Sequence, residues 1–524
     1  MKEKILTSLL TVLALSTLHA QSTSGVQTPR LVVGITIDQL RSDYLEAFTT
    51  LYGEKGFKRL LKEGRIYCNP SYNFSNLDRA SAVASIYSGT TPSRNGIVGA
   101  QWLDRSSLRP ITCVDDKNFM GIYTAENSSP HRLTVSTFPD ELKISSQGRS
   151  IVYAIAPQRE AAVLAAGHAA NGAYWLNDLT GKWCGSTYYG DFPRWLMVYN
   201  DNNSTDKRIS SLTWEPYRSF SAYDNPAKEN SFRYTFNDNR KYRRLKVSPC
   251  VNAEVNRVVN ACLYGTMLGA DPVTDFLSVT YNAGAFQSES GVSSYVEMQD
   301  TYVRLDEDIA SLLDMIDRKV GLANTLFFVT STGYVEHQSI DYTAYRIPTG
   351  EFYIHRASAL LNMYLMAVYG QGQYVEAFDG LQLYLDHKLI EKKQLRLKEV
   401  LDRSAEFLAD LSGVRKVYTS YDLLLGAWSP EQAKVRNSYS SICSGDLIIQ
   451  INAGWKLMDA DSNELETVRE AVVNFPLIFL GPNIQPKTIH TPVSMDCVAP
   501  TLSMFMRIRA PNACISSPLT DVKE

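Results

Sequence analysis

Short runs of consecutive apolar residues alternate along this chain with longer segments in which apolar residues recur every three or four positions. The runs lie at Leu31–Ile37, Ser150–Ala156, Phe276–Tyr281, Thr325–Thr330, Leu447–Ile451 and Leu477–Leu480. Such runs are typical of strands in a parallel sheet that is covered on both faces. Helical spacing is clearest at Tyr302, Leu305, Ile309, Leu312, Leu313 and Ile316. The alternation predicts an α/β fold with a doubly wound, mostly parallel sheet flanked by helices.

Two stretches interrupt this rhythm and are predicted to be insertions that cap the sheet. Residues 188–249 are polar and aromatic, and their basic run from Arg240 to Lys246 is interpreted as a solvated face. Residues 349–425 contain a strongly amphipathic helix that begins near Leu397. The predicted organisation is a signal peptide (1–20), a tether (21–30), a core in three parts (31–187, 250–348 and 426–524) and the two insertions.

The N-terminal stretch has the pattern of an export signal. Lys2 and Lys4 precede an apolar segment, Ile5–Leu18, and Ala20 is a small residue suited to cleavage. No later stretch supplies about 20 uncharged apolar residues, so no membrane-spanning helix is predicted. We therefore expect an exported protein that is periplasmic, at the cell surface or secreted.

The bulk composition is that of an ordinary soluble protein, with 44% hydrophobic and 20% charged residues. The formal net charge of −3 gives no reason to expect nucleic acid or an anionic membrane as a partner. The eight cysteines form no C-x-x-C pair, which argues against a thiolate zinc site or a redox motif. They are interpreted as structural disulfides or as buried thiols, and the pairing stays open.

The most informative segment runs from Asn73 to Trp102, NFSNLDRASAVASIYSGTTPSRNGIVGAQW. It predicts a turn, a helix over the small apolar residues Ala80–Tyr87 and a second turn at Asn95-Gly96. This segment resembles the nucleophile segment of the alkaline phosphatase superfamily, most closely that of the PafA-type phosphatases. Further framework motifs carry the resemblance from about Leu31 to Leu519: Ala165–Trp175, Asp300–Ile309, Ile347–Phe352, Ser444–Asp446 and Val498–Asn512. The resemblance implies the fold of that family but not its activity.

For an active family member, the resemblance implies a catalytic threonine and two zinc ions about 4 Å apart that bind the phosphoryl group. Arg79 stands at the threonine position, and its protonated guanidinium cannot attack phosphorus. Of six family ligand positions, only the aspartate after the first strand is kept, as Asp38. The family's Asp-x-x-x-His pair is matched here by Ala285 and Glu289. Its Asp-His pair is matched by Ser331 and Thr332, and its late histidine is matched by Leu465. Glu289 is the one possible substitute ligand among them.

The phosphate-binding side chains implied by the resemblance are also replaced. A lysine and an arginine that hold phosphate oxygens in the family match Gln158 and Glu160, and a phosphate-binding asparagine matches Ala100. A glutamate in place of an arginine repels a phosphate group instead of attracting it.

Because nucleophile, ligands and phosphate clamp are lost together on an intact framework, we interpret the chain as a pseudoenzyme. The predicted function is non-catalytic binding or scaffolding in the cell envelope, with a protein partner or a ligand in the vacated cleft and no cofactor. The alternative is a metal-dependent phosphate- or sulfate-ester hydrolase with a rebuilt site, which would use zinc. Under that alternative, His337 beside Glu336 is a candidate ligand and Ser81 a candidate nucleophile.

Loss of the metals predicts a new partner for Asp38, since an unpaired buried carboxylate costs several kcal/mol or takes up a proton. Arg79 occupies a position that lies close to a metal in the family. We therefore predict that its guanidinium pairs with Asp38, with Glu160 or Glu289, or with more than one of them. The alternative is that Arg79 points to solvent and the cleft collapses.

Overall fold

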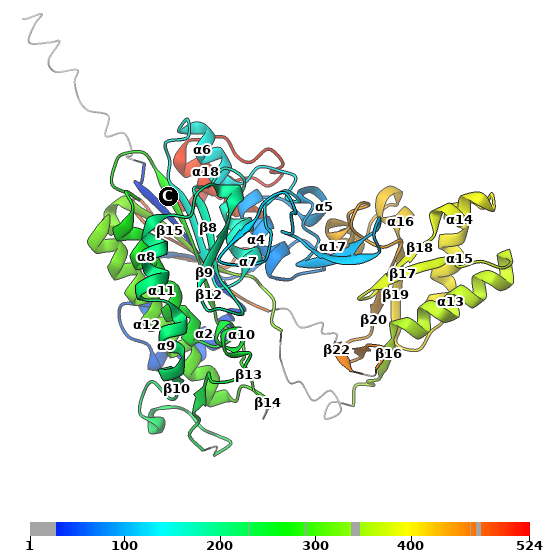
Figure 1. Cartoon of the computed structure of the whole chain (residues 1–524), viewed down its shortest axis with the longest axis horizontal. Helices are drawn as coiled ribbons and strands as arrows, with labels where there is room; N and C mark the ends of the chain where they lie inside the picture. Colours follow the sequence, from blue (N-terminus) through cyan, green and yellow to red (C-terminus); the bar gives the residue numbers. More distant parts are fainter. Residues whose placement is uncertain are drawn as a thin grey trace, which may run out of the picture.

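The computed structural model describes residues 28–228, 230–288, 291–336, 346–461, 463–467 and 473–523. Its core is a sheet with the strand order β24-β2-β23-β15-β1-β12-β7-β8-β9-β6, in which β24 is Lys487–Ile489, β2 is Arg65–Tyr67 and β6 is Gly121–Ile122 (Figure 1). The five central strands are parallel: β15 (Thr325–Ser331), β1 (Leu31–Asp38), β12 (Asp275–Asn282), β7 (Val152–Ala156) and β8 (Gly172–Leu176). Antiparallel neighbours follow on both sides, β23 (Leu477–Leu480) beside β15 and β9 (Trp183–Ser186) beside β8. The predicted α/β fold with a mostly parallel sheet is confirmed.

Helices cover both faces of this sheet (Figure 1). On one face, alternate side chains of β1 join a core with α11 (Cys250–Gly265) and α12 (Tyr295–Lys319), the long helix predicted from its apolar stripe. On the other face lie α4 (Arg79–Ser88), α7 (Arg159–Ala166) and α18 (Val498–Met506). A Cβ atom at Gly34 of β1 would lie 2.7 Å from the ring of Phe328 and 2.9 Å from the hydroxyl of Tyr87. Glycine at this position therefore lets α4 approach the sheet closely.

The first insertion contains α8 (Arg194–Asn202), α9 (Thr205–Arg208) and α10 (Lys241–Lys246), and its helices α8 and α10 pack on α11. Its main polar anchor is Asp300 of α12, which is fully buried. The carboxylate of Asp300 accepts hydrogen bonds from Nε1 of Trp214 at 2.7 Å and from the hydroxyl of Tyr223 at 2.6 Å. It also accepts from the backbone N–H of Tyr217 at 2.6 Å. The motif that begins at Asp300 therefore fastens the insertion to the core.

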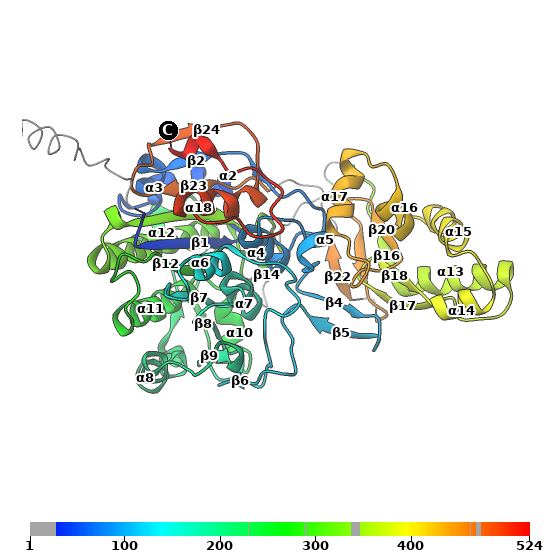
Figure 2. The same cartoon turned by 90° about the horizontal axis from the view of Figure 1, so that it is seen from above.

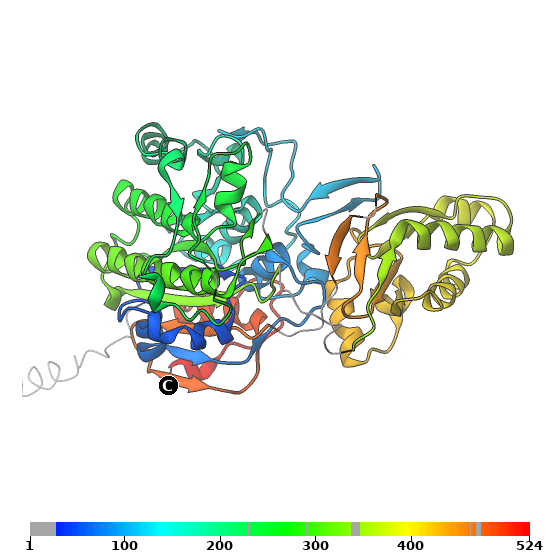
Figure 3. The same ribbon diagram turned by 90° about the horizontal axis from the view of Figure 1, so that it is seen from below.

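The second insertion forms a lobe beside the core (Figures 2 and 3). It contains α13 (Ile354–Tyr369), α15 (Leu397–Ala409) and a sheet of β17 (Val375–Asp379), β18 (Gln382–Leu385), β20 (Leu447–Ile451) and β19 (Val414–Thr419). The prediction that Leu447–Ile451 belongs to the central sheet is wrong, because β20 pairs with β18 and β19. The lobe therefore continues well past Leu425, the predicted end of the insertion. An apolar run predicts a strand but not its neighbours.

Among the contacts that tie this lobe to the core, two involve the side chains of Asp446 and Ser438. The hairpin of β4 (Gln101–Asp104) and β5 (Arg109–Thr112) carries Arg105, whose Nη2 lies 3.0 Å from Oδ1 of the buried Asp446. At the second contact, Oγ of Ser438, the last residue of α17 (Pro430–Ser438), accepts the backbone N–H groups of Ser75 and Asn76 at 2.9 Å each. The lobe is thus fixed to the segment that leads into α4.

The predicted signal peptide (1–20) and most of the tether (21–30) lie outside the described residues. Within the described parts of the chain, no helix has the length and apolar character needed to cross a membrane. All eight cysteines are described, and all are free thiols, six of them buried. The disulfide interpretation is therefore not supported, whereas the buried-thiol interpretation fits most of these residues.

The framework motif around His168 forms a charge-assisted contact that predicts a pH effect on stability. Its imidazole lies between Oδ2 of Asp140 at 2.9 Å and the carbonyl oxygen of Leu133 at 2.8 Å. Burial opposes protonation, but the hydrogen bond to Asp140, the charge of that carboxylate and the carbonyl oxygen of Leu133 together outweigh it and raise the pKa of His168 above its ordinary value. A histidine whose pKa is higher in the folded state binds its proton more tightly there, and this tighter binding stabilises the fold. The added stability is fully present below the unfolded-state pKa of about 6.5 and is lost as the pH rises through the folded-state pKa.

We therefore expect His168→Gln to destabilise the protein more at about pH 6 than at about pH 9. The pH-dependent part should stay below about 1 kcal/mol, because the side chain is 34% exposed and solvent screens the pair. Urea unfolding of both proteins at the two pH values measures it. An equal destabilisation at both pH values would contradict the assignment of a protonated His168.

Candidate functional site

Asp38 is the last residue of β1, at the edge of the sheet where the parallel strands end and α/β proteins place their chemistry. Its side chain is fully buried. The hydroxyl of Thr332, just after the neighbouring strand β15, donates to Oδ1 of Asp38 at 2.8 Å. The same hydroxyl accepts the backbone N–H of Gln39 at 3.0 Å. Thr332 stands at a replaced ligand position, and its hydroxyl thus binds one carboxylate oxygen of Asp38, the retained ligand position.

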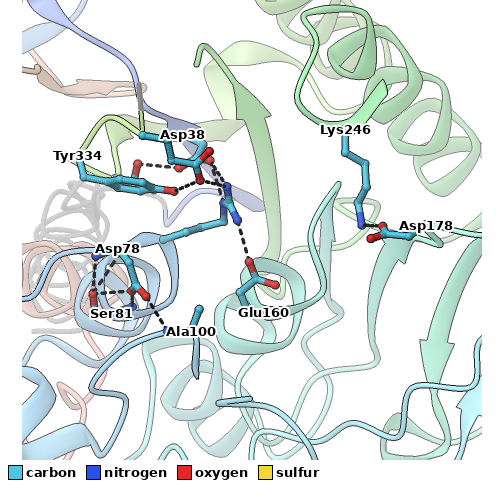
Figure 4. A network of polar contacts seen from close by, with 11 residues as sticks. Asp38, Asp78, Ser81, Ala100, Glu160, Asp178, Lys246 and Tyr334 are labelled. Atoms are coloured by element: carbon cyan, nitrogen blue, oxygen red, sulfur yellow. Dashed lines mark hydrogen bonds and ion pairs between the residues drawn. The ribbon is translucent and has the colours of Figure 1, made fainter. Parts of the chain in front are cut away.

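Arg79 is the first residue of α4, and the start of this helix is fixed by Asp78. The Asp78 side chain accepts the backbone N–H of Ser81 at 2.8 Å, and the Ser81 hydroxyl donates to Oδ1 of Asp78 at 2.8 Å. The backbone N–H of Ala100 donates to Oδ2 of Asp78 (Figure 4). This capping box holds Arg79 at a defined place. It also engages the hydroxyl of Ser81, the candidate nucleophile, in helix capping.

The guanidinium of Arg79 contacts three carboxylates. Its Nε and Nη2 lie 2.8 and 2.7 Å from Oδ2 of Asp38, so both nitrogens meet one oxygen. Nη1 lies 2.9 Å from Oε1 of Glu160, and Nη2 lies 3.4 Å from Oε1 of Glu336. The predicted pairing of Arg79 with Asp38 and Glu160 is confirmed. Glu336 was not predicted as a partner, because nothing in its local sequence links it to Arg79.

The electrostatics of the cluster follow from burial and this pairing. Burial disfavours the charge of Arg79, but Asp38, Tyr334, Glu160 and Glu336 outweigh it and hold the pKa of the guanidinium well above its ordinary value. Burial likewise raises the pKa of Glu160, but Arg79 reverses the effect and the net pKa is lowered. One cation therefore faces three carboxylates. With these groups ionised, the Arg79 cluster (Arg79, Asp38, Glu160 and Glu336) has an excess of negative charge.

The neighbouring segment Gln158-Arg159-Glu160 forms the start of α7. It has a glutamine and a glutamate at the positions where the resemblance implies a phosphate-binding lysine and arginine. Nη2 of Arg159 lies 3.0 Å from Oδ1 of Asp115 and 2.9 Å from the hydroxyl of Thr112, so Arg159 points away from Arg79 toward the β5 hairpin. Gln158 is buried, and its Oε1 has no hydrogen-bond partner within the part of the chain that the structure describes. Lys246 forms an ion pair with Asp178 beside this segment (Figure 4).

The remaining predicted positions are not all brought together. Ala285, in the loop after β12, has no ligand atom, and the hydroxyl of Ser331 donates to the carbonyl oxygen of Leu40 at 3.0 Å. Leu465 lies in β22 (Glu464–Thr467) of a small sheet with β16 (Glu351–Tyr353) and β21 (Lys456–Met458), and is 59% exposed. The match of Leu465 to a site position is therefore not supported, because no motif fixes the alignment there. Glu289 and His337 lie outside the described residues.

A zinc ion does not fit the residues that the structure places here. Zinc sites need at least three protein ligands with free lone pairs. The oxygens of Asp38 are taken by Arg79 and Thr332, and no group of three or more His, Cys, Asp or Glu side chains suited to a metal occurs among the described residues. A guanidinium in contact with Asp38 also repels a divalent cation.

Comparisons with known proteins place this geometry in context. Residues 32–474 match the family described as type I phosphodiesterase / nucleotide pyrophosphatase. Alkaline phosphatase PafA of Elizabethkingia meningoseptica is 29% identical, with 96% of each chain covered. Alkaline phosphatase PhoV of Synechococcus elongatus is 28% identical over the full length of both chains. The crystal structure of wild-type PafA matches with a TM-score of 0.82 at 28% identity, covering 96% of this chain and 100% of PafA.

Proposed function

We propose a non-catalytic binding role for this chain, which belongs to the type I phosphodiesterase / nucleotide pyrophosphatase family and shares the fold of its alkaline phosphatase relatives. The observation that carries the proposal is the ion-pairing of Arg79 with Asp38, Glu160 and Glu336. At the position where the resemblance implies a nucleophile, this chain supplies a guanidinium, and its partner is Asp38, the retained ligand carboxylate.

The charge of the site supports the same proposal. A phosphate monoester is a dianion at neutral pH, so a binding site needs cations or hydrogen-bond donors that face it. The Arg79 cluster instead has more carboxylates than cations, and Glu336, with its side chain 42% exposed, places one of them toward solvent. Without zinc and a phosphate clamp, a hydroxyl introduced at position 79 would have neither activation nor transition-state stabilisation.

We place this binding role in the cell envelope, because Ile5–Leu18 has the pattern of an export signal.

The second insertion supports a protein partner. Leu360, Met363 and Val368 expose an apolar face of α13, and Leu424 and Leu425 do the same at the end of α16 (Ser420–Leu425). Exposed apolar groups that gather on one lobe are typical of interaction surfaces.

The proposal predicts that the purified protein carries no stoichiometric zinc and does not turn over aryl phosphate monoesters, diesters or sulfate esters. Arg79→Thr alone is expected to stay inactive. Active enzymes accelerate such reactions by at least about a millionfold, so even a small residual activity would be visible. Elemental analysis of the protein, with and without dialysis against zinc, and initial-rate assays provide the measurement. PafA prepared in the same way is the positive control.

The names of the relatives favour the alternative, a metal-dependent ester hydrolase with a rebuilt site. Two bound zinc ions per chain, or turnover that follows the protein through purification, would establish that alternative and reject the proposal. Turnover by Arg79→Thr but not by the natural protein would show that a metal site forms once the guanidinium is removed, and would contradict the prediction that this variant stays inactive.

A further inference from the structure

A cavity of about 570 Å³ opens on the outer face of the helical layer, and it contains none of the residues of the Arg79 cluster. Its walls come from α8, α9, α11 and α12, the helices that cover one face of the sheet (Figure 1). This volume falls within the range of about 300–1,000 Å³ that is typical of small-molecule sites. The cavity is therefore large enough for a ligand the size of a monosaccharide.

Two arginines that line this cavity are held by Glu254, a residue outside the lining that is only 1% exposed. Its carboxylate accepts the hydroxyl of Thr205 at 3.1 Å and pairs with the guanidinium groups of Arg208 and Arg257. Nη2 of Arg208 also donates to the hydroxyl of Tyr199 at 3.0 Å. The buried carboxylate thus holds two cations at the cavity wall, and their charge exceeds its own by one unit.

Arg257 is the cation that remains available to a ligand. Only its Nη1 is engaged, with Glu254, and its side chain is 47% exposed. Among the described residues, its Nε and Nη2 have no hydrogen-bond partner. These two N–H groups form one edge of the planar guanidinium, the geometry that binds two oxygens of a carboxylate or phosphate.

The other polar side chains of the lining suit a hydroxylated molecule. Asn203, Asn256, Asn260 and Ser311 line the cavity and supply amide and hydroxyl groups. Burial raises the pKa of the remaining acidic group, Asp308, to about 7, although Arg304 and Arg257 oppose the shift and the amide of Asn256 donates to its carboxylate. Asp308 is therefore partly protonated near neutral pH, which weakens its repulsion of an anion.

We propose that this cavity binds a small hydroxylated organic anion, with its carboxylate or phosphate on the free edge of Arg257 and its hydroxyl groups on the asparagine side chains. The inference is independent of the proposed non-catalytic role, because it uses no residue of the Arg79 cluster.

Isothermal titration of the mature protein with gluconate, glucose 6-phosphate and glucose tests the proposal. At least one of the two anions should bind, and the neutral sugar should bind at least about tenfold more weakly, a difference of 1.4 kcal/mol. A preference between the two anions distinguishes a carboxylate from a phosphate ligand. Failure of both anions to bind at millimolar concentration, or equal binding of glucose, would overturn the proposal.

Two variants locate the site. Arg257→Gln removes the cation, and Asn260→Asp adds a negative charge to the wall without touching the Glu254 network. Each should weaken anion binding by at least about tenfold. Arg318→Gln, on the exposed part of α12, is the matched control and should bind normally. Thermal unfolding confirms that each variant is folded. Unchanged binding by both cavity variants, or equal loss in the control, would show that the anion binds elsewhere.

Discussion

Arg79→Ala is expected to lower the free energy of unfolding by about 3–5 kcal/mol, the range for removal of one partner from a buried ion pair. Asp38 is fully buried and Arg79 is 14% exposed, so the alanine variant leaves a carboxylate with only the hydroxyl of Thr332 as a side-chain partner among the described residues. Glu160 loses its cation as well. Urea unfolding followed by circular dichroism measures the change.

Two controls separate this effect from the general cost of replacing an arginine. Arg94→Ala, on the neighbouring helix α5 (Pro92–Asn95), removes an exposed arginine and should change stability by no more than about 0.5 kcal/mol. The double variant Asp38→Leu/Arg79→Met replaces both charges by apolar groups and should be far less destabilised than Arg79→Ala. A decrease of less than about 1 kcal/mol in the free energy of unfolding of Arg79→Ala would mean that water reaches the site and screens the ion pair.

Added calcium provides an independent readout of the same variant. Without the guanidinium, the carboxylates of Asp38, Glu160 and Glu336 face one another with no cation between them. A divalent ion that binds only the folded state raises its stability. Millimolar calcium should therefore raise the melting temperature of Arg79→Ala more than that of the natural protein. An equal response of the two proteins would argue against Arg79 as the substitute for metal charge.

Asp300→Ala is expected to cause a second large loss of stability, again about 3–5 kcal/mol. The Asp300 carboxylate is fully buried, pairs with Arg304 at 2.7 Å and accepts three further hydrogen bonds from the first insertion. Its removal leaves those donors without an acceptor, and each buried unsatisfied donor costs about 1–3 kcal/mol. The insertion around Trp214 and Tyr223 should loosen, which near-ultraviolet circular dichroism detects.

The same helix offers a matched control for this prediction. Asp314 and Arg318 form an ion pair at 2.7 Å with the same spacing in α12, but both side chains are more than half exposed. Asp314→Ala should therefore cost no more than about 1 kcal/mol. Similar losses for Asp300→Ala and Asp314→Ala would reject the view that burial of Asp300 fastens the insertion.

Much of the fold could be predicted from the sequence, because apolar runs such as Leu31–Ile37 have one stable solution, a strand covered on both faces. The partners of a strand were harder to predict. Leu447–Ile451 is a strand, yet it lies in the second lobe, since sheet membership depends on contacts with β18 and β19 that are distant in sequence. Hydrophobic pattern carries little information about such pairings.

The ion pairs of Arg79 with Asp38 and Glu160 could be predicted from the sequence, because a buried carboxylate needs a cation. A buried Asp38 without a cation is unstable, and Arg79 stands at a position that the resemblance places close to a metal, so its guanidinium could supply the missing charge. Glu336 and Thr332 could not be assigned as partners in the same way. Both follow β15, and only the three-dimensional path of that loop places Glu336 3.4 Å from Arg79 and Thr332 2.8 Å from Asp38. Leu465 was misplaced because no motif anchored the alignment near it.

The contact of Ser438 with the backbone of Ser75 and Asn76 has a consequence for how this architecture changes over time. A lobe that is joined to the core only by its two chain connections can be replaced by another without the loss of other contacts. Here the lobe supplies hydrogen-bond acceptors to the turn that positions Arg79, so its excision would leave two backbone donors unpaired at the start of α4. We therefore expect substitutions at the end of α17 to disturb the turn that positions Arg79, even though the two lie in different parts of the molecule.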